Sequence, residues 1–92
     1  MIKSWKHKGL RIFFETGSKA GIQPKHAHIL SLLLLQLASA TKPEDMNTPG
    51  NYFHSLQGNL KGYFSVKVNG NWRIIFQFVG KNAVLVDYVD YH

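Results

Sequence analysis

The chain has 92 residues, of which 45% are hydrophobic and 13% aromatic, enough for one core and too few for two. Cysteine is absent, which excludes disulfides and thiolate metal sites and allows a reducing cytoplasm. Eleven Lys and Arg against five Asp and Glu leave a formal net charge of +6. This balance favours an anionic partner, whether nucleic acid, an anionic membrane or an acidic protein, without deciding among them.

No stretch predicts export or insertion into a membrane. Residues 1–6 lead into no apolar run of the kind found in secretory signals. The leucine-rich stretch 29–38 contains Ser31 and Gln36 and is too short for a membrane span, which needs about 20 residues. We therefore expect a single cytoplasmic domain over residues 1–92, with a buried helix at 29–38.

The first half of the chain predicts a short strand and two helices. Residues 2–6 alternate between apolar and polar side chains, which indicates the strand. The first helix should end at Gly17, a residue suited to a helix C-terminus. Its apolar face is formed by Leu10, Phe13 and Phe14. Residues 18–23 form a turn, and Pro24 suits the start of a second helix that should end near Ala40.

The second helix carries more leucine than contact with one sheet requires. Its core face is expected to consist of Ala27, Leu30, Leu34 and Leu37. A wider apolar arc is formed by Leu32, Leu33 and Leu35. We expect these leucines to pack inside the fold, with contact to a partner as the alternative.

After a loop at 41–51, the apolar period changes to two and predicts a meander of antiparallel strands. Tight turns are expected at Asn69-Gly70 and at residues 80–82. If the helices cover Trp72 and Phe76, the other face should be open to solvent. That face would display Tyr63, Ser65, Lys67, Arg73 and Gln77. The predicted architecture is α+β, in the order β-α-α-β-β-β-β, with both helices on one face of a mainly antiparallel sheet.

Arg73 is the first candidate for chemistry, because it is a lone guanidinium in an otherwise apolar strand. Such a group requires an anion, for example a phosphate. A structural salt bridge to Asp87 or Asp90 on the neighbouring strand is an equally good explanation.

The histidines give one further candidate. His54 lies near a predicted sheet edge, where an imidazole can act as a general acid or base, although an ordinary surface position is the alternative. His26 and His28 are two residues apart in a helix and point to different faces, so we expect no shared metal site. His7 lies between two lysines and is expected to be another basic surface group.

The chain ends on a strand-like run that places two carboxylates, two phenols and an imidazole beside the terminal carboxylate. These residues are Asp87, Tyr88, Asp90, Tyr91 and His92. The run can move protons or bind phosphate. The alternative is an exposed end that frays.

Five motifs follow one another over essentially the whole chain. They are His7-Lys8-Gly9-Leu10, Phe13-Phe14-Glu15-x-Gly17, Leu60-Lys61-Gly62-Tyr63-x-Ser65-Val66, Gly70-Asn71-Trp72-Arg73-Ile74 and the terminal Asp90-Tyr91-His92. Together they resemble HigB-type toxins of the RelE-like superfamily. The resemblance implies a RelE-like fold and a ribosome-dependent endoribonuclease that cleaves mRNA in the ribosomal A site without a metal or other cofactor. It also implies a HigA-like helix-turn-helix antitoxin, through which alone the toxin would reach operator DNA.

The resemblance also implies roles for single residues. The family's catalytic positions correspond to His54, Arg73, Asp90, Tyr91 and His92. Arg73 would stabilise charge on the phosphate, His54 and His92 would transfer protons in an order left open, and Tyr91 would position or stack on a base. RNA or phosphate binding would fall to Gln57, Lys61, Tyr63 and Lys67.

One departure from the family pattern is at Gln57. Relatives usually read His-Pro-Leu-Lys-Gly where this chain has His54-Ser55-Leu56-Gln57-Gly58, so a cation is lost. The loss would cost on the order of 2–4 kcal/mol of transition-state stabilisation unless Lys61 reaches the site. A second hypothesis is therefore a weakened relative that mainly binds its antitoxin and acts as an operon co-repressor. A third is a basic module that binds RNA without cleaving it.

Overall fold

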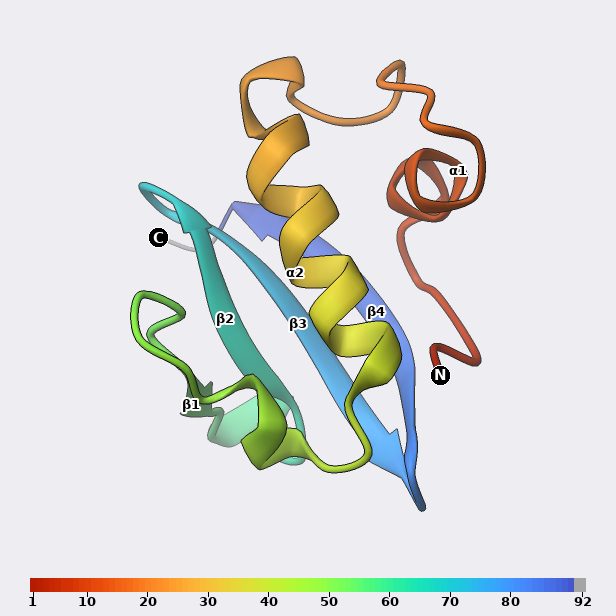
Figure 1. Cartoon of the computed structure of the whole chain (residues 1–92). Coiled ribbons are helices and arrows are strands. Elements are labelled where there is room, and N and C mark those ends of the chain that lie inside the picture. The colour runs from red at the N-terminus through yellow and green to blue at the C-terminus, as the bar shows by residue number, and fades with distance from the viewer. Residues whose placement is uncertain (91–92) are drawn as a thin grey trace.

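The computed structural model describes residues 1–90, which form two α-helices and a four-stranded antiparallel sheet (Figure 1). The elements are α1 (Lys8–Thr16), α2 (Ala27–Ser39), β1 (His54–Ser55), β2 (Phe64–Asn69), β3 (Trp72–Val79) and β4 (Asn82–Asp90). Short 3-10 turns are η1 (Pro24–His26), η2 (Pro43–Met46) and η3 (Gly58–Leu60). The strands follow the spatial order β1-β2-β3-β4, each antiparallel to its neighbour. The predicted α+β, RelE-like architecture is confirmed.

The predicted N-terminal strand is reduced to two isolated parallel bridges with β4, Ile2 to Ala83 and Trp5 to Val86. A regular ladder is interrupted because Leu85 adopts a left-handed backbone conformation, with φ of 55°. Its N–H donates to the Ser4 hydroxyl oxygen at 2.8 Å instead of to a backbone carbonyl. The segment thus follows the free edge of β4 irregularly.

Both ends of α1 are capped by residues next to the helix. At the N-terminus, the His7 Nδ1 accepts the Leu10 N–H at 2.9 Å, so His7 is a helix cap rather than only a basic surface group. At the C-terminus, Gly17 has a φ of 82° and donates to the Phe13 carbonyl at 2.8 Å. The predicted stop at Gly17 is therefore confirmed.

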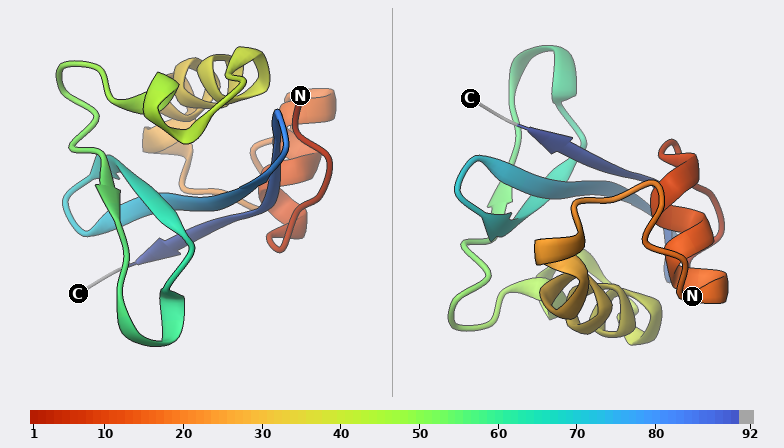
Figure 2. Two further views of the ribbon diagram at one scale, coloured as in Figure 1. Left: turned by 90° about the horizontal axis from the view of Figure 1, so that it is seen from below. Right: turned by 90° about the horizontal axis from the view of Figure 1, so that it is seen from above.

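The core lies between α2 and the sheet, and α1 lies beside α2 at the β4 end of the molecule (Figure 2). The buried leucines of α2 are Leu30, Leu33, Leu34 and Leu37. Leu10 and Phe13 of α1 join the same core. Of the wider apolar arc, Leu33 is buried as expected, but Leu32 and Leu35 are 54% and 62% exposed. For these two the expectation of internal packing is wrong, because they lie on the face of α2 that points away from the sheet.

The face of the sheet opposite α2 is less open than expected. Lys67, Arg73 and Gln77 are partly exposed there, but Ser65 is 1% and Tyr63 is 9% exposed. Ser65 lies under the Arg73 guanidinium, and the Lys6 ammonium lies 5.9 Å from the centre of the Tyr63 ring. The loop that contains η3 also extends on this side of the sheet (Figure 2). The prediction of solvent exposure is therefore wrong for Ser65 and Tyr63.

Gly9 in the first turn of α1 packs directly on the backbone of Gly21. A Cβ atom on Gly9 would lie 2.6 Å from the Gly21 carbonyl oxygen and 2.8 Å from its Cα, closer than such atoms can approach. We expect Gly9→Ala to lower the free energy of unfolding by about 1–3 kcal/mol, because backbone rather than a flexible side chain must move. Urea denaturation would measure this, with the exposed Ser18→Ala as control. Equal midpoints for Gly9→Ala and wild type would contradict this packing.

Candidate functional site

A cavity of about 350 Å³ lies where β1 meets the β2–β3 hairpin. It is lined by His54, Ser55, Leu56, Ser65, Gly70, Asn71 and Arg73. Arg73 alternates with the core residues Trp72 and Ile74, so its side chain is on the sheet face away from α2. The fold thus brings His54 and Arg73, two of the three described candidates for chemistry, to one cavity.

His54 is held by a short edge strand whose preceding loop is tied down. His54 pairs with Ser65, which orients the exposed imidazole on the Arg73 face. Upstream, the Asn51 carbonyl accepts the Lys67 N–H at 2.8 Å, and the Asn51 amide donates to the Met46 carbonyl at 2.9 Å. Since Met46 is fully buried, these bonds fix the loop that leads into β1.

The Arg73 guanidinium is oriented by neutral oxygens. Its Nη1 donates to the Ser65 hydroxyl at 2.9 Å and to the Tyr52 carbonyl at 3.4 Å. In β4, Val89 lies opposite Arg73. Asp90 pairs instead with Trp72, whose side chain is on the other face of the sheet. Both of these acceptors are neutral oxygens, so the two bonds orient the guanidinium and leave it suited to bind an anionic group in the cavity.

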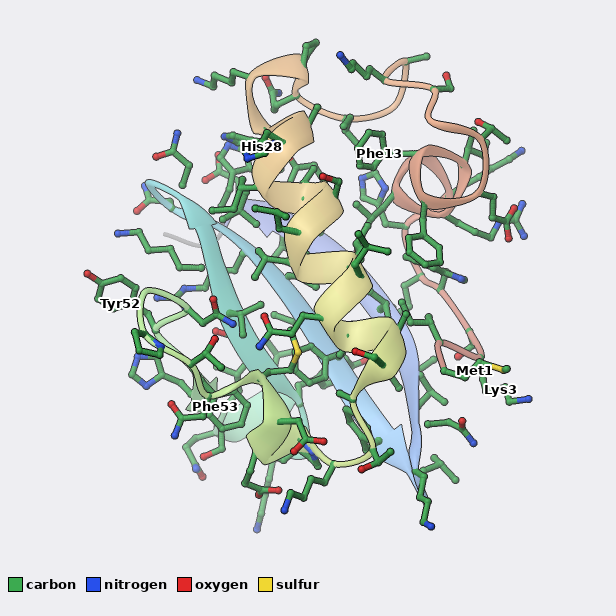
Figure 3. The ribbon with its side chains drawn as sticks, viewed as in Figure 1. Met1, Lys3, Phe13, His28, Tyr52 and Phe53 are labelled. Carbon is green, nitrogen blue, oxygen red and sulfur yellow. The ribbon has the colours of Figure 1, made fainter. Side chains whose placement is uncertain are left out.

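Tyr52 is a residue of this region that the sequence analysis missed. Its side chain points outward from the loop before β1, while Phe53 stacks on Phe64 with ring centres 5.6 Å apart (Figure 3). Tyr52 is 61% exposed, and the Lys67 ammonium lies 4.8 Å from its ring centre. Its φ of 49° is left-handed, a conformation that costs on the order of 1–3 kcal/mol in a non-glycine residue. Two adjacent aromatics just before a candidate catalytic histidine were the available signal.

The other predicted RNA-binding residues lie around the cavity rather than in it. Gln57 and Lys61 flank η3, and both are exposed. Lys67 pairs with Arg73 on the neighbouring strand, which places two cations side by side. Tyr63 is buried beneath Lys6. The structure therefore groups Lys67 with Arg73 and assigns Tyr63 a packing position.

The end of β4 lies beside the hairpin that lines the cavity. Asp90, the last described residue, pairs with Trp72, which is adjacent in sequence to Asn71 and Arg73 of the cavity wall. Tyr91 and His92 follow directly in the sequence and lie outside the described residues. Their roles stay predictions.

Behind Arg73, on the core side of the sheet, a buried histidine at the end of η1, just before α2, contacts β4. His26 is 1% exposed, and its Nδ1 lies 2.5 Å from the Tyr88 hydroxyl. The Tyr88 ring is packed against Trp72, with ring centres 4.6 Å apart, and its edge meets His7 at 5.3 Å. His26 is thus a core residue, which could not be predicted from its neighbours in the sequence because its partner, Tyr88, is far along the chain.

Protonation of His26 should destabilise the fold. Burial lowers the pKa of His26 below its ordinary value, and the neighbouring Lys25 charge lowers it further. Burial raises the pKa of Tyr88, with a backbone hydrogen bond from Gln23 acting in the opposite direction, so the phenol keeps its proton. Because the unfolded state then binds more protons than the folded state, this contribution to stability is complete above the unfolded pKa of about 6.5 and is lost as the pH falls below it.

We therefore expect the free energy of unfolding to fall between about pH 7.5 and pH 5, and to fall less steeply in His26→Gln, which has no ionisable group at this position. Denaturant titrations of both proteins across this range would measure the two slopes. The chain has five histidines. The difference between the two slopes removes the contribution of the four other than His26. Parallel slopes would contradict a neutral, buried His26.

Within residues 1–90, no group of three or more His, Cys, Asp or Glu side chains is placed to hold a metal ion. In the same residues, neither helix has the length and apolar character needed to cross a membrane.

Comparison with known proteins identifies the family to which the chain belongs. Residues 3–92 match the family model described as RelE-like toxin of type II toxin-antitoxin system HigB. The chain is 39% identical over 92 residues to Endoribonuclease HigB of Proteus vulgaris, with all of both chains covered. It is 35% identical over 94 residues to Toxin HigB-1 of Vibrio cholerae serotype O1, covering 100% of this chain and 98% of that relative. The chain therefore belongs to the HigB family of RelE-like toxins of type II toxin–antitoxin systems.

Proposed function

We propose that this chain is a ribosome-dependent endoribonuclease toxin that cleaves mRNA in the ribosomal A site. The observation that carries the proposal is the meeting of His54 and an oriented, positively charged Arg73 in one cavity on the face opposite α2. Membership of the family, and the name Endoribonuclease HigB of the Proteus vulgaris relative, support it.

The proposed reaction is a transesterification within the RNA. The ribose 2′-oxygen attacks the adjacent phosphorus, its proton passes to a base, and the bond from phosphorus to the 5′-oxygen breaks as an acid protonates that oxygen. Arg73 stabilises the charge that develops on the phosphoryl oxygens. His54 and His92 are the proposed proton-transfer pair, Tyr91 stacks on a base, and Asp90 assists beside them. This scheme needs no metal ion.

RNA contacts are proposed around the cavity. Lys67 supplies a second cation next to Arg73, and Tyr52 supplies an exposed ring on which a base can stack. Lys61 and Gln57, on the exposed η3 loop, would contact phosphates further along the strand. Tyr63, also predicted to bind RNA, is buried and would act by supporting this face.

The chemical ends of the products test the mechanism. We expect products that end in a 2′,3′-cyclic phosphate and a 5′-hydroxyl. We expect no cleavage where the nucleotide on the 5′ side of the scissile phosphate lacks its 2′-hydroxyl. The reaction should require translating ribosomes, so the same mRNA free in solution serves as control. A 3′-hydroxyl with a 5′-phosphate would contradict attack by the 2′-oxygen, and equal cleavage of free mRNA would contradict ribosome dependence.

We also propose that a HigA-like helix-turn-helix antitoxin neutralises the toxin in the cytoplasm and carries it to operator DNA. The type II character of the family supports a protein antitoxin. Copurification of this chain with the product of an adjacent reading frame, and operator binding by the complex but not by the toxin alone, would test both parts. Operator binding by the isolated toxin would contradict the second.

The second candidate function is that of a catalytically weakened relative. It is favoured by Gln57, which stands where relatives usually have a lysine. Gln57 does not line the cavity, whose cationic lining residue is Arg73. We therefore expect Gln57→Lys to change the cleavage rate by less than about tenfold, or about 1.4 kcal/mol. Gln23→Lys, at another exposed glutamine, controls for the added charge. A gain of about 10²-fold or more, the size of a restored oxyanion donor, would favour the weakened relative.

A further inference from the structure

Tyr88 is a buried side chain of β4 that contacts three other parts of the chain. Its hydroxyl lies 2.5 Å from the Nδ1 of His26, at the end of η1, and a backbone hydrogen bond from Gln23 reaches the same phenol. Its ring packs on Trp72 of β3, with ring centres 4.6 Å apart. It also makes an edge contact with His7, the N-cap of α1. Tyr88 is therefore held by β3, by the start of α1 and by the turn before α2.

The donors and acceptors around the Tyr88 hydroxyl form one consistent arrangement. The Gln23 N–H can only donate, so the Tyr88 oxygen accepts from it. The phenol keeps its proton because burial raises the pKa of Tyr88. Its O–H is then available to donate to the Nδ1 of a neutral His26. The hydroxyl is bonded on both sides, which fixes the direction of the Tyr88 side chain.

Tyr88 lies where β4 loses one of its two neighbours. The N-terminal segment follows one edge of β4, and the N–H groups of Lys6 and His7 both donate to the Val86 carbonyl. Within residues 1–90, this pairing goes no further along β4. From Val86 to Asp90 the strand is paired on the β3 side. The buried contacts of Tyr88 therefore take the place of a second neighbouring strand.

The same contacts connect the end of β4 to the cavity on the other face of the sheet. Trp72, which packs on Tyr88, directly precedes Arg73 in β3 and pairs with Asp90. A shift of the Tyr88 ring would thus move Trp72 and Asp90 relative to the guanidinium, because adjacent residues of a paired strand cannot move independently. From Asp90 the chain continues into its last two residues, which the proposed reaction uses.

We propose that Tyr88 is a positioning residue for RNA cleavage, whose bond to His26 fixes the end of β4 relative to Arg73. This inference rests on the proposed nuclease function. Tyr88 is 4% exposed and packs in the core, so it acts through the strand and not by touching RNA. A misplacement of about 1 Å at a reacting centre can cost on the order of 10²-fold in rate. A single buried hydroxyl can therefore affect the reaction without being part of it.

The first test removes the hydroxyl and keeps the ring, with Tyr88→Phe. On programmed ribosomes we expect kcat to fall by about 10- to 10²-fold and KM to change by less than about twofold, because reacting geometry is lost and ribosome binding is not. His26→Asn, whose amide oxygen can replace Nδ1 as acceptor, should keep more activity than His26→Leu. The control is Leu37→Val, which weakens the core at the far end of α2 and should change kcat by less than about threefold.

The double variant Tyr88→Phe, His26→Leu separates positioning from stability. Replacing both partners of a buried hydrogen bond with apolar groups recovers much of the stability that is lost when only one is replaced. If the bond positions β4, the double variant should still cleave as slowly as Tyr88→Phe at a temperature where every variant is folded. Recovery of kcat together with stability would overturn the proposal.

Amide hydrogen exchange gives a readout that does not depend on activity. In Tyr88→Phe, the amides of residues 87–90 should exchange at least about tenfold faster than in wild type, while those of β2 should change no more than in Leu37→Val. An equal change throughout the sheet would overturn the proposal. If wild type cleaves no RNA but exchange rises selectively at 87–90, the nuclease function fails and the anchoring of β4 by Tyr88 stands.

Discussion

Replacing Arg73 with alanine is expected to lower the rate of RNA cleavage by about 10²- to 10³-fold. The guanidinium is held by the Ser65 hydroxyl at 2.9 Å and by the Tyr52 carbonyl at 3.4 Å, so it meets the phosphate already oriented. Removing such a donor costs about 2.7–4 kcal/mol of transition-state stabilisation. Single-turnover cleavage on programmed ribosomes would measure the loss.

Two control variants separate orientation from charge. Arg73→Lys keeps the charge but loses the planar fork of donors, and we expect it to fall between alanine and wild type. Lys81→Ala removes an exposed cation at the β3–β4 turn and should leave the rate unchanged. Because Ser65 is 1% exposed and loses its donor in Arg73→Ala, stability should also fall by about 1–3 kcal/mol, so rates must be compared well below the unfolding temperature. Full activity of folded Arg73→Ala would remove this residue from the mechanism.

His54→Ala is expected to slow cleavage by about 10²- to 10⁴-fold, the range for loss of a positioned acid or base. Since His54 is exposed on a two-residue edge strand, its loss should barely change stability. His28→Ala removes an exposed imidazole from α2, away from the cavity, and serves as the matched control. Figure 3 shows His28 near the start of α2.

Added imidazole distinguishes proton transfer from a structural role. If His54 moves a proton, free imidazole should restore part of the activity of His54→Ala and do nothing for Arg73→Ala. Equal rates for His54→Ala and His28→Ala would show that the cavity histidine takes no part in the reaction.

Local sequence patterns were sufficient to predict most of the elements. The stop of α1 at Gly17 depends on a backbone conformation that glycine adopts without strain. The Asn69-Gly70 turn likewise depends on its own residues, with Gly70 at a φ of 56°. Alternation in β3 identified Ile74 and Phe76 as core residues, because successive side chains of a strand point to opposite faces.

The site was predictable only in part. The resemblance identified His54 and Arg73, and the period of β3 placed Arg73 on the open face. Neither could show that Ser65 would be buried beneath the guanidinium or that Tyr52 would stand beside it. These outcomes depend on how the loop before β1 folds back on β2. They therefore depend on contacts between residues that lie far apart in the sequence.

By itself, then, the sequence determined the family, the helix ends, the hairpins and the choice of His54 and Arg73 as candidates for cleavage, because each is encoded by neighbouring residues or by a motif. Only the tertiary structure decided that His26 is a core residue bonded to Tyr88, and that Lys3 and Arg11 line one cavity. The physical reason is that burial and electrostatic environment are set by whichever distant segment packs against a residue. That information is absent from the residue's own neighbourhood in the chain.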